Sequence, residues 1–319
     1  MSDHRIDVVS IQLQPHIAAD TLSIVQIWGY TCVVKTAEWL GVTQAAYVPP
    51  DYVLPDKPEY SFLQGHMRIR VRRFRGVMSQ GLLLPAPPGA KIGDNVIEQL
   101  GIKRYEPPEP LTMGGDNEPA PEGIYPVYDI ESYNRWPLIF NPEEEVWTSE
   151  KLHGSSSRWV WQEDRMRVGS HRNWKKPDPN NLWWKALAQN AWIEPFCKAH
   201  PNWALYGEVF GQVQDLKYGH DRNKFSVAVF DIWDGAKWLD PHTMVAVGRE
   251  HGVAFVPELY CGPATESVLR QLANGPSKVP GANHIREGIV IKPVMERSCP
   301  EIGRVILKLV SDEYLEKAK

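Results

Sequence analysis

The 319-residue sequence lacks several features that would assign it to a class at once. Its four cysteines, Cys32, Cys197, Cys261 and Cys299, form no C-x-x-C pair, which argues against a zinc site or a disulfide framework. No run of residues is apolar and long enough to span a bilayer, no internal repeat is visible, and the first twenty residues are too charged for a secretory signal. We therefore expect a cytoplasmic protein with reduced thiols that does not bind a membrane.

An excess of basic charge is also missing. The formal net charge is −4 and the isoelectric point is about 6.2, so any basic surface that binds nucleic acid must be local. Hydrophobic residues make up 43% and charged residues 23% of the chain, as in an ordinary globular protein. A chain of this length predicts two domains with ample core.

Short β-like segments joined by turns dominate the first hundred residues. They lie at 6–13, 22–34 (interrupted by Gly29), 45–48 and 67–75, and the one short helix is expected at 95–100. Many short strands without a long helix predict a small barrel.

The strand expected at 67–75 is rich in arginine and places Arg68, Arg70 and Arg72 on one face. A basic strand of this kind could line a nucleic-acid-binding groove. It could equally be a solvated edge strand whose charges prevent aggregation. The sequence leaves both interpretations open.

The composition changes at residues 106–125, where prolines and glycines cluster and no periodicity survives. We predict an extended, partly stiff linker between two domains, at residues 1–105 and 126–319. The second domain mixes strands, at 145–148, 203–210, 225–233, 289–292 and 304–310, with helices at 183–200, from 240 and from 265 to 273. This mixture predicts the α+β class.

The most informative stretch is Glu150-Lys151-Leu152-His153-Gly154, which follows a predicted strand. A lysine at a strand end, three residues before a glycine, can place its amine beside a nucleotide phosphate. The amine is nucleophilic only when neutral, so nearby cations or a metal must lower its pKa. Gly154 would let the backbone approach the ligand closely. An isolated match of this kind could also be a surface loop.

Four further segments follow in order, at 206–211, 229–232, 286–292 and 305–309. Together with 150–154 they resemble the covalent nucleotidyltransferase superfamily of polynucleotide ligases and RNA capping enzymes. The E-K-x-H-G form, followed by E-G-I-V-I-K at 287–292, most resembles ATP-dependent RNA ligases.

Domain order refines this resemblance. Most members carry an OB barrel after the last lysine motif, whereas only nine residues follow Val310 here, so we expect the barrel at the N-terminus. This order, with the segments 16–22 and 100–108, resembles the Deinococcus-type RNA ligases. It implies an N-terminal OB-like β-barrel followed by an ATP-grasp-like nucleotidyltransferase domain of antiparallel sheets with flanking helices.

The resemblance implies a monomeric enzyme that uses ATP and Mn²⁺ or Mg²⁺ to seal nicked duplex RNA or RNA–DNA. Lys151 would attack the α-phosphate, the AMP would pass to a 5′-phosphate, and a 3′-hydroxyl would then displace it. Lys292 and Lys308 would contact the α-phosphate and, by proximity, help keep Lys151 neutral. The usual K-x-K of the last motif is Lys308-Leu309-Val310 here, so Arg304 or another cation would have to substitute.

The remaining roles concern the nucleotide and the metal. Glu287 would bind the metal. Glu150 would face the adenine edge, Glu208 a ribose hydroxyl, and Phe230 would stack on adenine, although strand aromatics are usually core residues. Arg172 would hold the ribose and a 5′-phosphate, with Arg165 and Arg167 as alternatives.

Two other functions remain open from the sequence. One is a guanylyltransferase that caps RNA, which the domain order and the E-K-x-H-G form disfavour. The other is a nucleic-acid-binding protein whose nucleotidyltransferase half is inactive, which the intact lysine and acid motifs disfavour.

Overall fold

The computed structural model describes residues 4–105 and 114–317, which fall into two compact units. The first comprises residues 4–105 with 133–137 and 315–317, and the second comprises 114–132 and 138–314. The first half of the predicted linker, 106–113, lies outside the described residues. No helix in either described range combines the length and the apolar character needed to cross a membrane.

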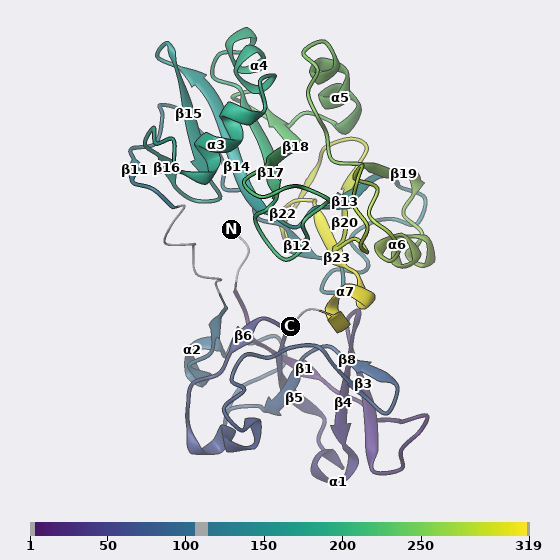
Figure 1. The fold of residues 1–319 in the computed structure, drawn as a ribbon. Coiled ribbons are helices and arrows are strands. Elements are labelled where there is room, and N and C mark those ends of the chain that lie inside the picture. The colour runs from purple at the N-terminus through teal and green to yellow at the C-terminus, as the bar shows by residue number, and fades with distance from the viewer. Residues whose placement is uncertain (1–3, 106–113, 318–319) are drawn as a thin grey trace. The chain divides into compact units, whose positions relative to one another are not determined.

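The first unit consists of small antiparallel sheets around two apolar clusters (Figure 1). Its elements are β1 (Asp7–Ser10), β2 (Gln14–Pro15), β3 (Leu22–Ile27), β4 (Tyr30–Lys35), α1 (Thr36–Trp39), β5 (Gln44–Val48), β6 (Tyr52–Val53), the 3-10 helix η1 (Pro58–Leu63), β7 (Arg72–Phe74), β8 (Val77–Ser79), β9 (Leu82–Pro85), α2 (Ile97–Leu100) and β10 (Lys103–Arg104). The three-stranded sheets have the orders β1-β5-β9 and β2-β3-β4. Short strands and no long helix are what the sequence predicted.

The arginine-rich segment differs from the single strand expected at 67–75. Only β7 is regular, and it forms a hairpin with β8 through Arg75 and Gly76, both of which have positive φ. Arg68 makes one isolated bridge with Val53. The alternation at residues 67–71 therefore did not produce a regular strand, because apart from the Arg68 bridge these residues have no ladder partner in the described part of the chain.

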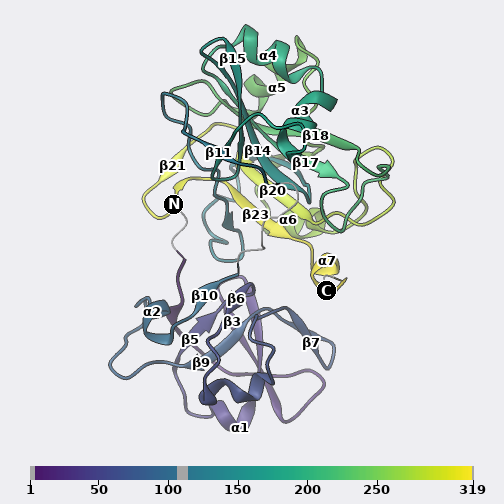
Figure 2. The same cartoon turned by 60° about the vertical axis from the view of Figure 1, so that its left-hand side comes forward.

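The second unit contains two large sheets with helices packed on them, and a small two-stranded sheet (Figure 1 and Figure 2). Its elements are β11 (Asn117–Glu118), β12 (Glu131–Ser132), β13 (Glu145–Lys151), β14 (Ser155–Gln162), β15 (Arg165–Ser170), β16 (Trp174–Lys175), α3 (Leu182–Gln189), α4 (Ile193–Ala199), β17 (Ala204–Gly211), β18 (Phe225–Trp233), α5 (Pro241–Arg249), β19 (Glu258–Pro263), α6 (Glu266–Ala273), β20 (Gly288–Pro293), β21 (Ser298–Cys299), β22 (Gly303–Arg304), β23 (Leu307–Val310) and α7 (Asp312–Lys317). Of the two large sheets, the larger has the order β11-β16-β15-β14-β17-β18 and the smaller has the order β12-β23-β20-β13-β19, whereas β21 and β22 form the two-stranded sheet. The α+β class is confirmed.

The helix expected at 183–200 is two helices. Asn190 ends α3 because its side-chain amide donates to Ala186 O (2.7 Å) and Phe225 O (3.2 Å) and accepts from Val227 N. These bonds tie the chain to β18 and interrupt the helical ladder. Asn181 is the N-cap, since its side chain accepts from the backbone N–H groups of Trp183 and Trp184.

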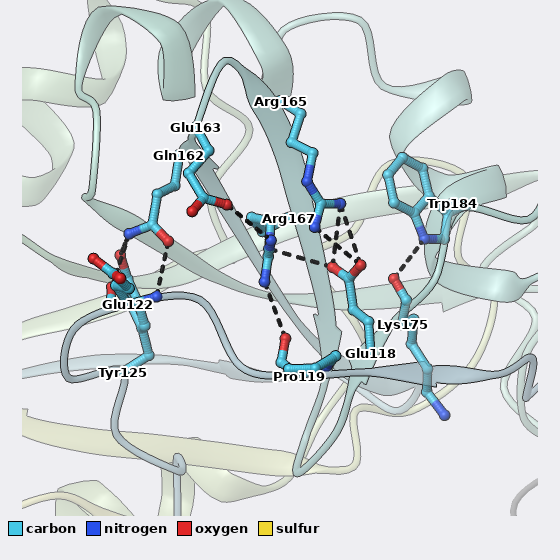
Figure 3. A network of polar contacts seen from close by, with 10 residues as sticks. All are labelled: Glu118, Pro119, Glu122, Tyr125, Gln162, Glu163, Arg165, Arg167, Lys175 and Trp184. Atoms are coloured by element: carbon cyan, nitrogen blue, oxygen red, sulfur yellow. Dashed lines mark hydrogen bonds and ion pairs between the residues drawn. The ribbon is translucent and has the colours of Figure 1, made fainter.

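The second half of the predicted linker is part of the larger sheet. β11 pairs with β16, and Glu118 forms ion pairs with Arg165 (3.1 Å) and Arg167 (3.3 Å) (Figure 3). Gln162 exchanges hydrogen bonds with the backbone of Glu122. Because prolines are tolerated in edge strands, a proline-rich segment can still be fastened along a sheet edge.

Candidate active site

Lys151 is the last residue of β13, where the smaller sheet brings two distant segments together. In the pairing of β13 with β20, Lys151 lies opposite Gly288. The preceding residue, Glu287, therefore stands beside the lysine, and Lys151 Nζ donates to Glu287 Oε1 at 2.6 Å. A buried carboxylate and a partly buried amine thus form an ion pair at the strand ends.

Glycines allow this close arrangement. A Cβ on Gly154 would lie 2.1 Å from Val209 O, and a Cβ on Gly288 would lie 2.3 Å from Leu309 O. The missing side chain at Gly154 therefore makes room for the backbone of β17, and close approach of Gly154 to a ligand stays a prediction. It lets β14 begin directly against β17, which carries Glu208.

His153 completes the cluster around Lys151. Its Nδ1 lies 3.2 Å from Glu287 Oε2, and its Nε2 lies 3.5 Å from Asp215 Oδ1 and 3.4 Å from the Tyr314 hydroxyl. Its backbone N–H donates to the Tyr218 hydroxyl at 2.7 Å. Lys151, Glu287 and His153 therefore form one connected polar group.

The sequence predicted that nearby cations or a metal lower the pKa of Lys151, and the side chains that act on this pKa here are the acids Glu287 and Glu208. Burial lowers the pKa of Lys151, but the carboxylates of Glu287 and Glu208 outweigh burial, and the pKa is raised overall. Burial would raise the pKa of Glu287, yet Lys151 and His153 hold it at about 2. The pKa of Glu208 is raised to about 8, chiefly by burial and further by Glu287. In this structure the lysine is therefore held protonated by acids.

A cavity of about 100 Å³ adjoins Lys151, and its lining includes Tyr128, Glu208, Phe230 and Val290. Phe230 is partly buried, with its ring 4.6 Å from that of Tyr128. Alternation along β20, and the position of Lys308 opposite Val290, place Val290, Lys292 and Lys308 on the cavity face of the smaller sheet. The structure thus brings together most of the predicted nucleotide-binding residues.

Lys292 lies on the predicted face, but its ammonium group is engaged elsewhere. It is 1% exposed and donates to Asp231 Oδ2 (3.2 Å) and Phe230 O (2.9 Å). Arg304 and the Tyr128 hydroxyl donate to the same carboxylate oxygen, at 2.7 Å and 2.6 Å. Arg304, suggested above as a substitute phosphate contact, is therefore part of a buried ion-pair network, as is Lys292.

We expect Asp231→Asn to lower the free energy of unfolding by about 3 kcal/mol or more, because it leaves the buried Lys292 ammonium without its anion, whereas Arg304 keeps Glu296. Chemical denaturation of the variant measures this difference. Adding Lys292→Met should recover part of the loss, since it removes the buried ammonium that Asp231→Asn leaves without an anion. A loss below about 1 kcal/mol, the size typical of a surface ion pair, would contradict a stabilising role for the network.

Glu150 is among the residues that line the cavity, but its carboxylate is bound by a neighbouring loop. It is buried on the opposite face of β13 from Lys151, where Oε1 accepts from Ser277 Oγ and Oε2 from Lys278 N, both at 2.6 Å. These bonds fasten the loop after α6. The structure supports a positioning role for Glu150, and contact with adenine stays a prediction that its orientation disfavours.

The arginines predicted to contact the nucleotide or nucleic acid fall into two groups, those paired with acids and those exposed. Arg165 and Arg167 are committed to Glu118, whereas Arg172 is exposed in the turn between β15 and β16. In the first unit Arg68 pairs with Asp51 at 2.6 Å and stacks on the Tyr105 ring at 3.7 Å, so its guanidinium already has partners within the unit. Arg70 and Arg72 are exposed.

Sequence reasoning missed Tyr128 and Ile130, which line the cavity. They follow the proline-rich segment, and no periodicity marked them as site residues. Tyr218 and Tyr314, which contact His153, were also missed because single tyrosines in loops or short helices carry no motif.

Comparison with known proteins agrees with this geometry. An RNA ligase family model matches residues 144–310, and an OB-fold domain model matches residues 6–86, which confirms the predicted N-terminal OB fold. The comparison with curated proteins finds no match.

Among solved structures, the chain is similar to three of Naegleria gruberi RNA ligase. They are a lysine-to-alanine variant with ATP and Mn (26% identity, TM-score 0.83), a glutamate-to-alanine variant with AMP and Mn (26%, 0.83) and the enzyme with PPi (27%, 0.82). Each alignment covers 98% of this chain and 98% of the other. The RNA ligase model spans more than half of the sequence and includes Lys151, Glu208, Glu287 and Lys308. The chain belongs to the RNA ligase family.

Proposed function

We propose that this protein is a monomeric, ATP-dependent RNA ligase that seals 3′-hydroxyl/5′-phosphate nicks in duplex RNA or RNA–DNA through a lysyl-AMP on Lys151. The observation that carries the proposal is the Lys151 amine, 2.6 Å from Glu287 beside a cavity walled by Glu208 and Phe230. In the first step Lys151 Nζ bonds to the α-phosphorus of ATP, the bond to the bridging oxygen breaks, and pyrophosphate leaves. The ammonium loses one proton to water before it attacks, and the nitrogen loses a second proton to water as the N–P bond forms.

Two carboxylates make the site suitable for Mn²⁺ or Mg²⁺. In residues 4–105 and 114–317 no cluster of three or more His, Cys, Asp or Glu side chains could hold a metal alone. Such a set is not required, because Mg²⁺ is commonly bound by one or two carboxylates together with substrate phosphates and water. Glu287 would be the main ligand. Glu208 would be a second one: its pKa is raised, and a bound cation would favour its ionised form. When bound, the cation supplies charge to the phosphates and competes with Lys151 for Glu287, which favours loss of the lysine proton.

The cavity walls suggest how AMP is held. Phe230 and Val290 would sandwich adenine, and Glu208 would accept a hydrogen bond from a ribose hydroxyl. Lys308 faces the cavity side of β23 and would contact the α-phosphate. Lys292 would do so only after leaving Asp231. Arg172, exposed near the cavity residue His171, would contact the ribose and the 5′-phosphate of the strand to be sealed.

Incubation with α-labelled ATP or GTP, with and without Mn²⁺, tests the proposal. Label from ATP should become attached to the protein in an acid-labile, metal-dependent bond, as a lysyl phosphoramidate requires. Preferential labelling by GTP would support the capping alternative. Absence of any label would support the nucleic-acid-binding alternative with an inactive nucleotidyltransferase half.

We expect the double variant Arg70→Ala with Arg72→Ala to bind nicked RNA more weakly at every sequence, because these exposed arginines would contact phosphates. The slope of log affinity against log salt concentration should fall by about 2. Arg68→Ala should affect stability more than binding. Lys35→Ala with Lys57→Ala removes the same charge from the same unit and is the matched control. If the two double variants weaken binding to nicked RNA equally, Arg70 and Arg72 are charges of a solvated edge and not specific phosphate contacts.

A further inference from the structure

The structure holds a tyrosine, Tyr314, against the histidine of the lysine motif. Tyr314 lies in α7, after the last predicted motif, and its hydroxyl is 3.4 Å from His153 Nε2. The two rings also pack, with centroids 5.6 Å apart. No motif in the sequence marked this residue, and the mechanism above does not use it.

The backbone that carries Tyr314 is fastened to the strand end that bears Glu287. Ser311 is fully buried, its N–H donates to Glu287 O at 2.8 Å, and its hydroxyl donates to Asn274 Oδ1 at 2.9 Å. The same hydroxyl accepts from Tyr314 N at 3.2 Å and so closes the first turn of α7. The position of Tyr314 is therefore tied to that of Glu287.

The contact with His153 extends to the reacting amine through one carboxylate. His153 Nδ1 lies 3.2 Å from Glu287 Oε2, and Glu287 Oε1 accepts from Lys151 Nζ at 2.6 Å. The two contacts engage both oxygens of the Glu287 carboxylate, so the imidazole helps set the orientation in which Oε1 faces Lys151. A partner that fixes the imidazole ring thus also fixes the carboxylate.

Tyr314 is better placed than Asp215 to fix the ring. Asp215 lies 3.5 Å from the same Nε2, but its side chain is 71% exposed, so water and salt screen its charge. The Tyr314 side chain is partly buried and its hydroxyl can donate or accept, so it suits His153 Nε2 whether or not this nitrogen carries a proton.

We propose that Tyr314 is a positioning residue for lysine adenylation: its hydroxyl and ring fix His153, and His153 in turn orients Glu287 toward Lys151. The expected change in the rate of lysyl-AMP formation rests on the proposed function. The fixed orientation of the His153 ring can be measured without any activity.

The test compares Tyr314→Phe, which keeps the ring and removes the hydroxyl, with Tyr260→Phe. Tyr260 donates to Pro263 O at 3.1 Å on β19 and does not line the cavity, so it controls for loss of one tyrosine hydroxyl bond. Tyr314→Phe should lower the rate of lysyl-AMP formation at saturating ATP about three- to tenfold, the effect of one hydrogen bond, with KM for ATP unchanged. Tyr260→Phe should leave both unchanged.

A second measurement needs no nucleotide. The ¹⁵N resonance of His153 Nε2, assigned by its absence from His153→Asn, should shift in Tyr314→Phe and not in Tyr260→Phe. An unshifted resonance would overturn the proposal. So would a raised KM with an unchanged saturating rate, which would make Tyr314 a nucleotide contact. If the wild-type protein forms no lysyl-AMP, the proposed function fails, and the resonance alone decides whether Tyr314 fixes His153.

Discussion

Lys151→Ala should abolish transfer of AMP from ATP to the protein, a loss of more than about 10³-fold, because no other group can replace the nucleophile. The other lysines of the cavity face are poor substitutes. Lys292 is buried against Asp231. Lys308 lies on β23 opposite Val290, whereas Lys151 lies opposite Gly288 at the start of β20. The amount of acid-labile label attached to the protein after incubation with α-labelled ATP measures the loss.

The same variant distinguishes the steps of the reaction. It should fail to seal a nick with an ordinary 5′-phosphate, yet still seal one whose 5′ end already carries AMP, since that step needs no lysyl-AMP. Lys198→Ala, which removes a lysine paired with Glu194 on the surface of α4, should behave as wild type. Labelling of the Lys151→Ala protein at the wild-type level would place the nucleophile elsewhere.

Glu287→Gln is expected to have the second largest effect. The substitution keeps the shape of the side chain and removes the charge that would bind a divalent cation and that now pairs with Lys151 and His153. Charge stabilisation by a metal is worth several kcal/mol, so adenylation should slow about a hundredfold or more. Single-turnover rates measured over a range of Mn²⁺ concentrations give this value.

Metal dependence separates this explanation from simple misfolding. Raising the Mn²⁺ concentration should restore part of the lost rate, and the thermal unfolding transition should remain cooperative. Glu145→Gln, at the exposed start of β13, is the matched control and should change neither the rate nor its metal dependence. An unchanged rate for Glu287→Gln at limiting metal would remove Glu287 from the metal site.

Local patterns were sufficient to predict several strands and the starts of two helices. The strands predicted at 225–233 and 289–292 correspond to β18 (Phe225–Trp233) and β20 (Gly288–Pro293), so here the structure agrees. It also agrees with the predicted starts of α5 at Pro241 and of α6 after Thr265. Such features depend on neighbours within a few residues, which the sequence displays directly.

Local patterns misled where a distant partner decided the outcome. The proline-rich segment around Glu118 has no periodicity, yet two arginines from β15 bind it to a sheet edge. Glu150 carries the same motif signal as Lys151, but one step along the strand turns it to the opposite face, where Ser277 and Lys278 bind it.

The sequence by itself determined the family motifs, their order, the domain order and the residue types of the site. Only the tertiary structure decided which charges meet. Lys151 and Glu287 are 136 residues apart in the chain, and Lys292 and Asp231 are 61 apart. Each pair forms because the register between strands sets it, and register depends on packing across the whole sheet. The carboxylates beside Lys151 are therefore set by strand register, which no short stretch of sequence contains.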